Sequence, residues 1–192
     1  MTQAIATRRE RHTVTRSSIL DAARRVAARD GAKDFSLRAV AAEADFVPAA
    51  LYSYFKSKDE LLLALAADDL SGLARAMRQS ENGAVSKFSA AAGAALAHLQ
   101  SSETIVAAAS ALPSQAGSSD AERLFNGRLI AVLKILSDAR GAALDARPSQ
   151  ADAVLLAAAL VGLAVFARSG RLAALGFASD ELVAALDRRF AI

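Results

Sequence analysis

The segment from Phe35 to Leu62 constrains the fold more than any other, because it specifies two short helices and the start of a third. Ser36 stands where an N-cap is expected, since its hydroxyl can accept a hydrogen bond from an amide of the first turn. Apolar residues then recur at the spacing of one helix face: Leu37, Val40, Ala41 and Ala44. Asp45 interrupts this pattern, and aspartate tolerates the left-handed backbone that ends a helix.

A second short helix is expected to begin at Pro48, because proline is tolerated at the first position of a helix. Leu51 and Phe55 give this helix an inward face. Ser57 and Glu60 have the spacing of a capping box, which predicts that a new helix starts at once. Two short helices joined by a tight turn outline a helix-turn-helix, whose second helix can enter the major groove of DNA.

The same segment resembles the DNA-binding signature of the TetR (tetracycline-repressor) family. The resemblance rests on the run ADFVPAALYSYF at 44–55, on the Lys58 and Leu61 that follow, and on weaker matches upstream, so that it covers about residues 16–65. The chain departs from the family pattern at three positions: Asp45 and Ala49 replace glycines, and Val47 replaces a serine. These departures bear on the details of base contact.

The resemblance implies an all-α fold with two domains. An N-terminal arm and a three-helix DNA-binding domain are expected at residues 1–58, with the helix-turn-helix at about 36–55. A helical effector-binding and dimerisation domain is expected at 59–192. The DNA contacts are then expected from Ser36, Arg38, Pro48, Ala49, Ala50, Tyr52, Ser53, Tyr54 and Lys58.

The expected recognition helix, 48–55, contains no Arg, Lys, Asn or Gln. It therefore lacks the side chains that read guanine or adenine with two hydrogen bonds, although its small apolar groups can contact thymine methyls. Arg38 matches a family position that reaches bases, and it is the residue able to donate two hydrogen bonds to a guanine. The alternative is that Arg38 contacts only phosphate.

Charge is unevenly distributed along the chain. Residues 1–58 carry 11 Lys or Arg against six Asp or Glu, a net of +5, whereas residues 59–192 carry 12 against 14, a net of −2. This split indicates a polyanionic partner for the N-terminal part alone. The first dozen residues, MTQAIATRRERH, lack the pattern of a secretory signal, which predicts a cytoplasmic protein. We expect them to form a mobile basic arm that either contacts DNA or stays in solvent, with the first helix opening at Thr13 or Thr15 and ending at Gly31.

The C-terminal part is expected to consist of helices at about 57–80, 84–100, 103–112 and 120–140. The last of these carries five large apolar residues: Leu124, Phe125, Ile130, Leu133 and Leu136. Ala153 to Ala167 is an uninterrupted apolar run of 15 residues, shorter than the roughly 20 that cross a bilayer. A helix that is apolar all round is buried all round, which in a chain of this size indicates a partner subunit. The alternative is an ordinary monomer core.

A final helix is expected over about 180–190, opened by Ser179. This helix and the one containing the apolar run resemble the four-helix dimer interface of the TetR family, two helices from each subunit. The interface residues implied are Val154, Leu155, Leu160, Val161, Leu182, Val183 and Leu186.

No catalytic constellation is apparent in the sequence. The chain has no cysteine, and its two histidines, His12 and His98, lie far apart. Asp68 and Asp69 are adjacent, so on a helix they point to different sides and do not make a paired site. We therefore expect that the protein is not an enzyme and that it binds neither a metal nor a cofactor.

Two functions remain. The resemblance implies a repressor that binds double-stranded DNA at a palindromic operator as a homodimer and is released by a small effector. The apolar composition of the chain favours a hydrophobic effector. Family helix order gives its pocket candidates: Phe88, His98, Phe125, Arg128 and Phe166. The alternative is a helix-turn-helix regulator without small-molecule control, which acts through DNA and protein contacts only.

Overall fold

The computed structural model describes residues 2–102, 104–109 and 119–190, with the side chains of 2–15, 32, 33 and 109 left outside this description. Every regular element in these ranges is a helix. The helices are α1 (Thr2–Asp34), α2 (Leu37–Glu43), α3 (Pro48–Leu51), α4 (Lys58–Ser80), α5 (Lys87–Ser101), α6 (Thr104–Ala109), α7 (Asp120–Ala139), α8 (Arg147–Arg168), α9 (Arg171–Ala174) and α10 (Ser179–Arg189). The prediction of an all-α fold is confirmed.

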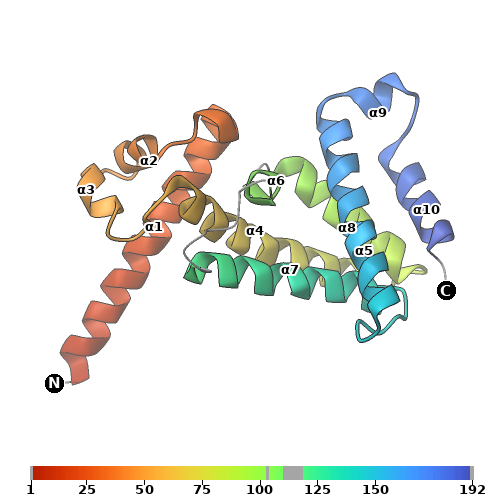
Figure 1. Ribbon diagram of the computed structural model, residues 1–192, viewed down its shortest axis with the longest axis horizontal. Helices are drawn as coiled ribbons and strands as arrows, with labels where there is room; N and C mark the ends of the chain where they lie inside the picture. Colours follow the sequence, from red (N-terminus) through yellow and green to blue (C-terminus); the bar gives the residue numbers. More distant parts are fainter. Residues whose placement is uncertain (1, 103, 110–118, 191–192) are drawn as a thin grey trace.

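Two apolar cores share helix α4. The first core joins α1, α2 and α3 to the start of α4 through Leu61, Leu62 and Leu65. The second core takes the rest of α4, including Leu70 and Met77, together with α5, α7, α8 and α10. In Figure 1, α4 leaves the N-terminal helices and runs beside α7 into the C-terminal bundle. The domain boundary expected after residue 58 stays a prediction, because α4 contributes to both cores.

Helix α1 begins earlier than the sequence analysis predicts. It starts at Thr2, so neither Thr13 nor Thr15 caps it, and the expected mobile arm is instead helical. The physical reason is that residues 2–30 contain neither proline nor glycine to stop the helix. Gly31 does interrupt it, as predicted, with φ 70° and ψ 172°. The side chains of the arm lie outside the described residues, so its contact with DNA stays a prediction.

Helix α7 buries only some of its large apolar residues. Phe125 and Leu136 are buried, but Leu124 is 47% exposed and Ile130 is 59% exposed. The buried residues of α7, which include Ala121 and Val132, follow one stripe at helical spacing. Ile130 lies on the opposite side of the helix from this stripe, and Leu124 lies at its flank. The expected helix at 103–112 is α6, and the expected end positions, 103 and 112, lie outside the described residues.

Helix α8 is not buried all round within one protomer. Its inner stripe is buried, but Val154 is 53% exposed, Leu155 57% and Phe166 46%. By length and composition the whole helix is apolar enough to cross a membrane, although the core helices of soluble proteins pass the same test. The sequence analysis missed the short helix α9 that follows. In helix α10 the N-cap position is occupied by Ala178, which makes no side-chain capping bond, and Ser179 is the first helical residue. The hydroxyl of Ser179 accepts a hydrogen bond from the side-chain amide of Gln100 at 3.3 Å.

Candidate nucleic-acid interface

The turn between α2 and α3 is set by local chemistry. The backbone of Ser36 is extended, with φ −146° and ψ 151°, and its Oγ accepts a hydrogen bond from the amide of Ala39 at 3.2 Å. At the other end of α2, Asp45 has a left-handed φ of 58°, as its position in the sequence predicts. The amide of Phe46 then donates to the carbonyl of Ala41 at 2.8 Å. These bonds fix the direction in which the chain enters α3.

Helix α3 is shorter than expected, because it ends at Leu51 and not at Phe55. A continuing helix would use the carbonyl of Ala50 to accept from the amide of Tyr54. Instead, the hydroxyl of Ser53 donates to that carbonyl at 2.6 Å, and the amide of Tyr54 donates to Leu51 at 3.0 Å. Serine near a helix end competes for backbone groups in this way. The residues after Leu51 therefore form turns while Phe55 remains fully buried.

The predicted DNA contacts lie on or directly beside α2 and α3 and at the start of α4, which Figure 1 shows together at one end of the molecule. Five of them are exposed: Arg38, Pro48, Ala49, Tyr52 and Ser53. The other four are half-buried: Ser36, Ala50, Tyr54 and Lys58. Sequence reasoning missed Val47, which is 70% exposed beside Pro48. The side chain of valine cannot cap a helix, so a valine at an N-cap position was the signal in the sequence that this residue has another role. An exposed apolar side chain here can contact a thymine methyl.

The cations of the N-terminal region differ in whether they are already paired. Glu43 of α2 accepts from Arg25 Nε at 2.7 Å and from Arg29 Nη1 at 2.9 Å, which ties α2 to α1. These hydrogen bonds lower the pKa of Glu43. Arg16 lies over the ring of Phe55, 4.5 Å from its centroid. Arg38, by contrast, takes part in none of the ion pairs of the described residues, so its guanidinium is available to a ligand.

The start of α4 is fixed by a variant of the predicted capping box. Ser57 Oγ accepts from the amide of Glu60 at 3.1 Å, as expected. The carboxylate of Glu60 accepts a hydrogen bond from the amide of Lys56 at 2.7 Å. In a standard capping box it would accept from the amide of the N-cap residue, which is Ser57 here. Lys58 is the first residue of the helix, where its charge and the helix dipole both favour an anion.

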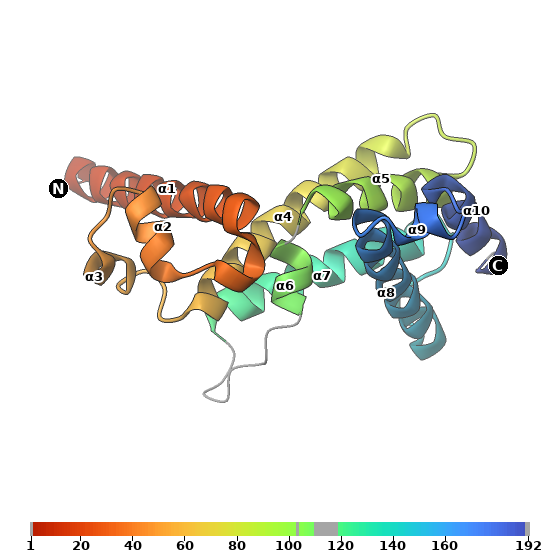
Figure 2. The same ribbon diagram turned by 90° about the horizontal axis from the view of Figure 1, so that it is seen from above.

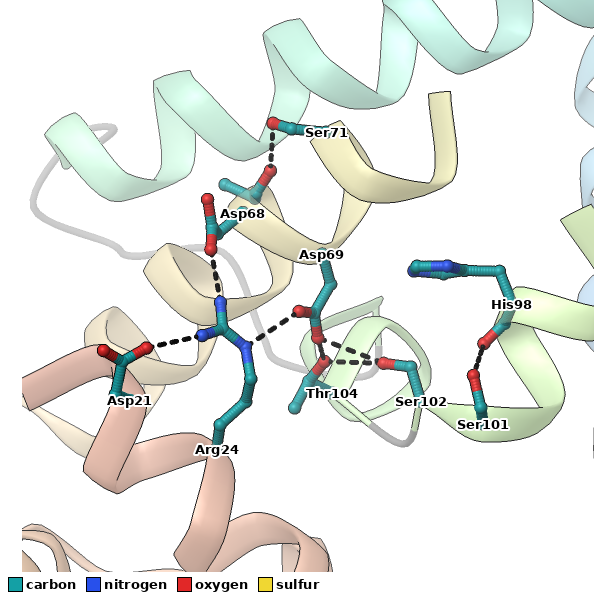
Figure 3. Close-up of polar contacts among 10 residues, drawn as sticks. Asp21, Arg24, Asp68, Asp69, Ser71, His98, Ser101, Ser102 and Thr104 are labelled. Atoms are coloured by element: carbon teal, nitrogen blue, oxygen red, sulfur yellow. Dashed lines mark hydrogen bonds and ion pairs between the residues drawn. The ribbon is translucent and has the colours of Figure 1, made fainter. Parts of the chain in front are cut away.

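Arg24 joins the N-terminal helices to the rest of the molecule (Figure 3). Its guanidinium pairs with Asp21 at 2.9 Å, with Asp68, and with Asp69 at 3.4 Å. Asp69 also accepts from the hydroxyls of Ser102, at 3.1 Å, and Thr104. Burial disfavours the charged form of Arg24, but the two carboxylates of α4 outweigh it and raise the pKa of Arg24. One carboxylate thus connects α1, α4, the end of α5 and the start of α6.

We expect Asp69→Ala to destabilise the protein by about 1–3 kcal/mol, because Arg24 and two hydroxyls lose an acceptor that is 14% exposed. Asp68→Ala is the matched control, since the Asp68 side chain is 58% exposed and its loss should cost less than about 1 kcal/mol. Urea unfolding of both variants measures the difference. Equal midpoints would contradict a special role for Asp69.

The predicted effector residues do not gather around one cavity. Phe88 and Phe125 are buried in the second core. His98 lines a cleft of about 570 Å³ that also contains Arg24, Asp69 and Thr104, and its ring lies 3.3 Å from the place a Cβ on Gly72 would take. Arg128 lines a different groove, against α4, and Phe166 is exposed on α8. No group of three or more His, Asp or Glu side chains that could hold a metal occurs in the part of the chain described.

The predicted dimer residues divide into two groups. Leu160 is 2% exposed and Val183 is 4% exposed, so both belong to the core of the protomer and cannot contact a partner in this conformation. The reason is that α8 turns the stripe Ala153, Leu156, Leu160 and Ala164 inward. The exposed members are Val154 and Leu155, and the half-buried members are Val161, Leu182 and Leu186.

Three comparisons bear on these features. Residues 19–65 match the model of the family described as bacterial regulatory proteins, tetR family. Over 68 residues the chain is 43% identical to the HTH-type nicotine-responsive transcriptional repressor HdnoR of Paenarthrobacter nicotinovorans. This match spans 35% of the chain and 35% of the relative, so about a third of the length of that curated relative is covered.

Solved structures extend the likeness along the chain. A protein of unknown function from Rhodococcus sp. RHA1 is 27% identical, with a TM-score of 0.68 over 93% of this chain and 96% of that one. BioQ bound to its natural double-stranded DNA operator is 22% identical, with a TM-score of 0.59 over 90% of this chain and 98% of that one. At that identity the second likeness concerns the fold alone.

Proposed function

We propose that the chain, whose residues 19–65 match the model of the tetR family of bacterial regulatory proteins, is a transcriptional repressor that binds DNA. The observation that carries the proposal is the position of Arg38. It is exposed on α2, the helix that packs against α3, and outside every ion pair of the described residues. The neighbouring Arg25 and Arg29 are held by Glu43, so they orient α2 and leave recognition to Arg38.

We further propose that the operator is palindromic and that the protein binds it as a homodimer. Support comes from the exposed apolar side of α8, where Val154, Leu155 and Phe166 face solvent in the protomer. Burying such a surface against its own copy gives a two-fold assembly, and a two-fold protein matches a two-fold operator. The DNA bound to BioQ is a natural operator of that protein, and we extend operator binding to this chain.

Release by a small, apolar effector is the last part of the proposal. The name of the curated relative describes a repressor that responds to nicotine, a small organic molecule. A second candidate is a regulator without small-molecule control, and one observation favours it: the five predicted effector residues are spread over the core, two separate clefts and the surface. A thermal-shift screen with apolar and aromatic compounds, paired with measurement of operator release, separates the two candidates.

Operator binding itself is tested by footprinting the purified protein on the DNA next to its own gene. The proposal expects protection of two half-sites about one helical turn apart or a multiple of it. Protection without any two-fold symmetry would refute the palindrome. Protection that does not depend on the DNA sequence would refute the proposal that the protein binds a specific operator.

Lys58→Ala should weaken the binding of all DNA sequences about equally and lower the salt slope of binding by roughly one, because a phosphate contact carries no sequence information. Lys87→Ala is the control, since Lys87 is also the first residue of a serine-capped helix but lies in the C-terminal part. Titrations at several salt concentrations measure both variants. The role of Lys58 is excluded if its salt slope equals that of the wild type.

A further inference from the structure

A polar groove runs between α4 and α7, far along α4 from the helix-turn-helix. It has a volume of about 440 Å³ and is lined by three arginines, Arg75, Arg78 and Arg128, with the amide side chains of Gln79 and Asn82. We call these five residues the arginine groove. Ala74 and Ala131 are small lining residues, which leaves room between the two helices. Both views show α4 and α7 side by side (Figures 1 and 2).

The arginines converge because of helical spacing. Arg75 and Arg78 stand at i and i+3 on α4, so they share one side of that helix, and Asn82 follows in the turn after its end. Arg128 comes from the middle of α7, which packs along α4. The three arginines of the groove are therefore held by two long helices.

The charge of the groove is unbalanced. The C-terminal part, 59–192, has a net charge of −2, yet three of its 12 cations line this one groove and no carboxylate does. Some arginines of the described residues have acidic partners, as Arg24, Arg25 and Arg29 do, but Arg75, Arg78 and Arg128 enter none of the ion pairs there. Like charges one helical turn apart destabilise a helix. An arrangement that is unfavourable in the free protein becomes favourable when an anion lies between the charges.

We propose that the arginine groove binds a small organic anion that carries phosphate or carboxylate groups. Guanidinium groups bind both of these with paired, charge-assisted hydrogen bonds, and the amides of Gln79 and Asn82 add neutral donors. The volume lies within the range of small-molecule sites. DNA bound at α2 and α3 does not reach the groove, because they lie at the other end of α4. The site is distinct from an apolar effector pocket and does not depend on one.

Isothermal titration of the full chain without DNA tests the proposal, with pyrophosphate as the phosphate probe and citrate as the carboxylate probe. We expect saturable binding of at least one probe, weakened by added salt. Replacement of all three groove arginines by glutamine should lower the affinity by about tenfold or more, since each removes charge-assisted hydrogen bonds. The matched control is Arg171→Gln/Arg188→Gln/Arg189→Gln, which removes three exposed charges elsewhere and should leave the affinity within about twofold of the wild type.

The probes distinguish the source of the anion. Binding of pyrophosphate alone assigns the groove to a phosphorylated ligand, and binding of citrate alone assigns it to a polycarboxylate. Equal losses in the two triple variants would overturn the proposal, because the effect would then be one of net charge. Lack of saturable binding of either probe to the wild type would also overturn it. Because the titration contains no DNA, its result is independent of operator binding.

Discussion

Leu155→Arg is expected to convert the proposed homodimer into a monomer and to abolish tight operator binding. Leu155 is 57% exposed in the protomer, so an arginine there stays solvated in the monomer and the fold is kept. In the dimer the same charge would be buried without a partner, which costs several kcal/mol. One half-site alone supplies too little binding energy to hold the monomer on the operator. Sedimentation velocity and a mobility-shift titration measure the two losses.

Ile130→Arg is the matched control, because Ile130 has nearly the same exposure, 59%, but lies on α7 and outside the proposed interface. It should remain dimeric and bind DNA normally. Loss of the dimer in both variants would place the interface elsewhere than α8 and α10. A wild-type protein that sediments as a monomer at micromolar concentration would refute the dimer altogether.

Leu160 is unsuitable for this test although the sequence analysis placed it in the interface. It is 2% exposed inside the second core, so Leu160→Arg would bury a charge in the protomer itself. The result would be unfolding and not dissociation. The distinction between Leu155 and Leu160 is what makes the experiment specific to assembly.

Arg38→Ala is expected to relax base selectivity at one G·C pair in each half-site by about 1–3 kcal/mol. Arg38 is exposed and in no ion pair of the described residues, so it has the donors for the two acceptors of guanine in the major groove. Helix α3 offers no comparable group, since its exposed residues are Pro48 and Ala49. Weaker thymine preferences should flank the pair. Selection of binding sites from a random pool reads out the change directly.

Ser53→Ala is the control for this selection. Its hydroxyl already donates to the carbonyl of Ala50 at 2.6 Å, so its removal should alter selectivity less than that of Arg38. An unchanged base preference in Arg38→Ala, with uniformly weaker binding, would mean that Arg38 contacts only phosphate. The shape of the recovered sequence pattern decides between the two roles.

The helix-turn-helix could be predicted from the sequence because its signals are local. The caps at Ser36 and Ser57, the left-handed Asp45 and the start of α3 at Pro48 each depend on a few neighbouring residues, and all four are confirmed. The predicted end of α3, at Phe55, was wrong because a single side-chain hydrogen bond, donated by Ser53, competes with the helical hydrogen bonds. No periodic pattern in the sequence reports such a bond.

The C-terminal part was less predictable because its signals depend on tertiary contacts. An apolar run such as 153–167 predicts a buried helix, but it does not tell which side meets its own protomer. The side of α8 that faces the protomer buries Leu160 and leaves Leu155 exposed. Likewise, the adjacent Asp68 and Asp69 gave no sign in the sequence that both would meet Arg24, 44 and 45 residues away.

Helix α4 also limits how the two ends of the molecule move. Leu62 in the first core and Met77 in the second project from one rigid rod, and 15 residues of α-helix separate them by about 22 Å. Rotation of this rod about its axis to suit one core would withdraw side chains from the other. Close-packed cores accept discrete arrangements and resist gradual deformation. A change of orientation at the DNA end therefore has to proceed as a switch in which both cores repack together.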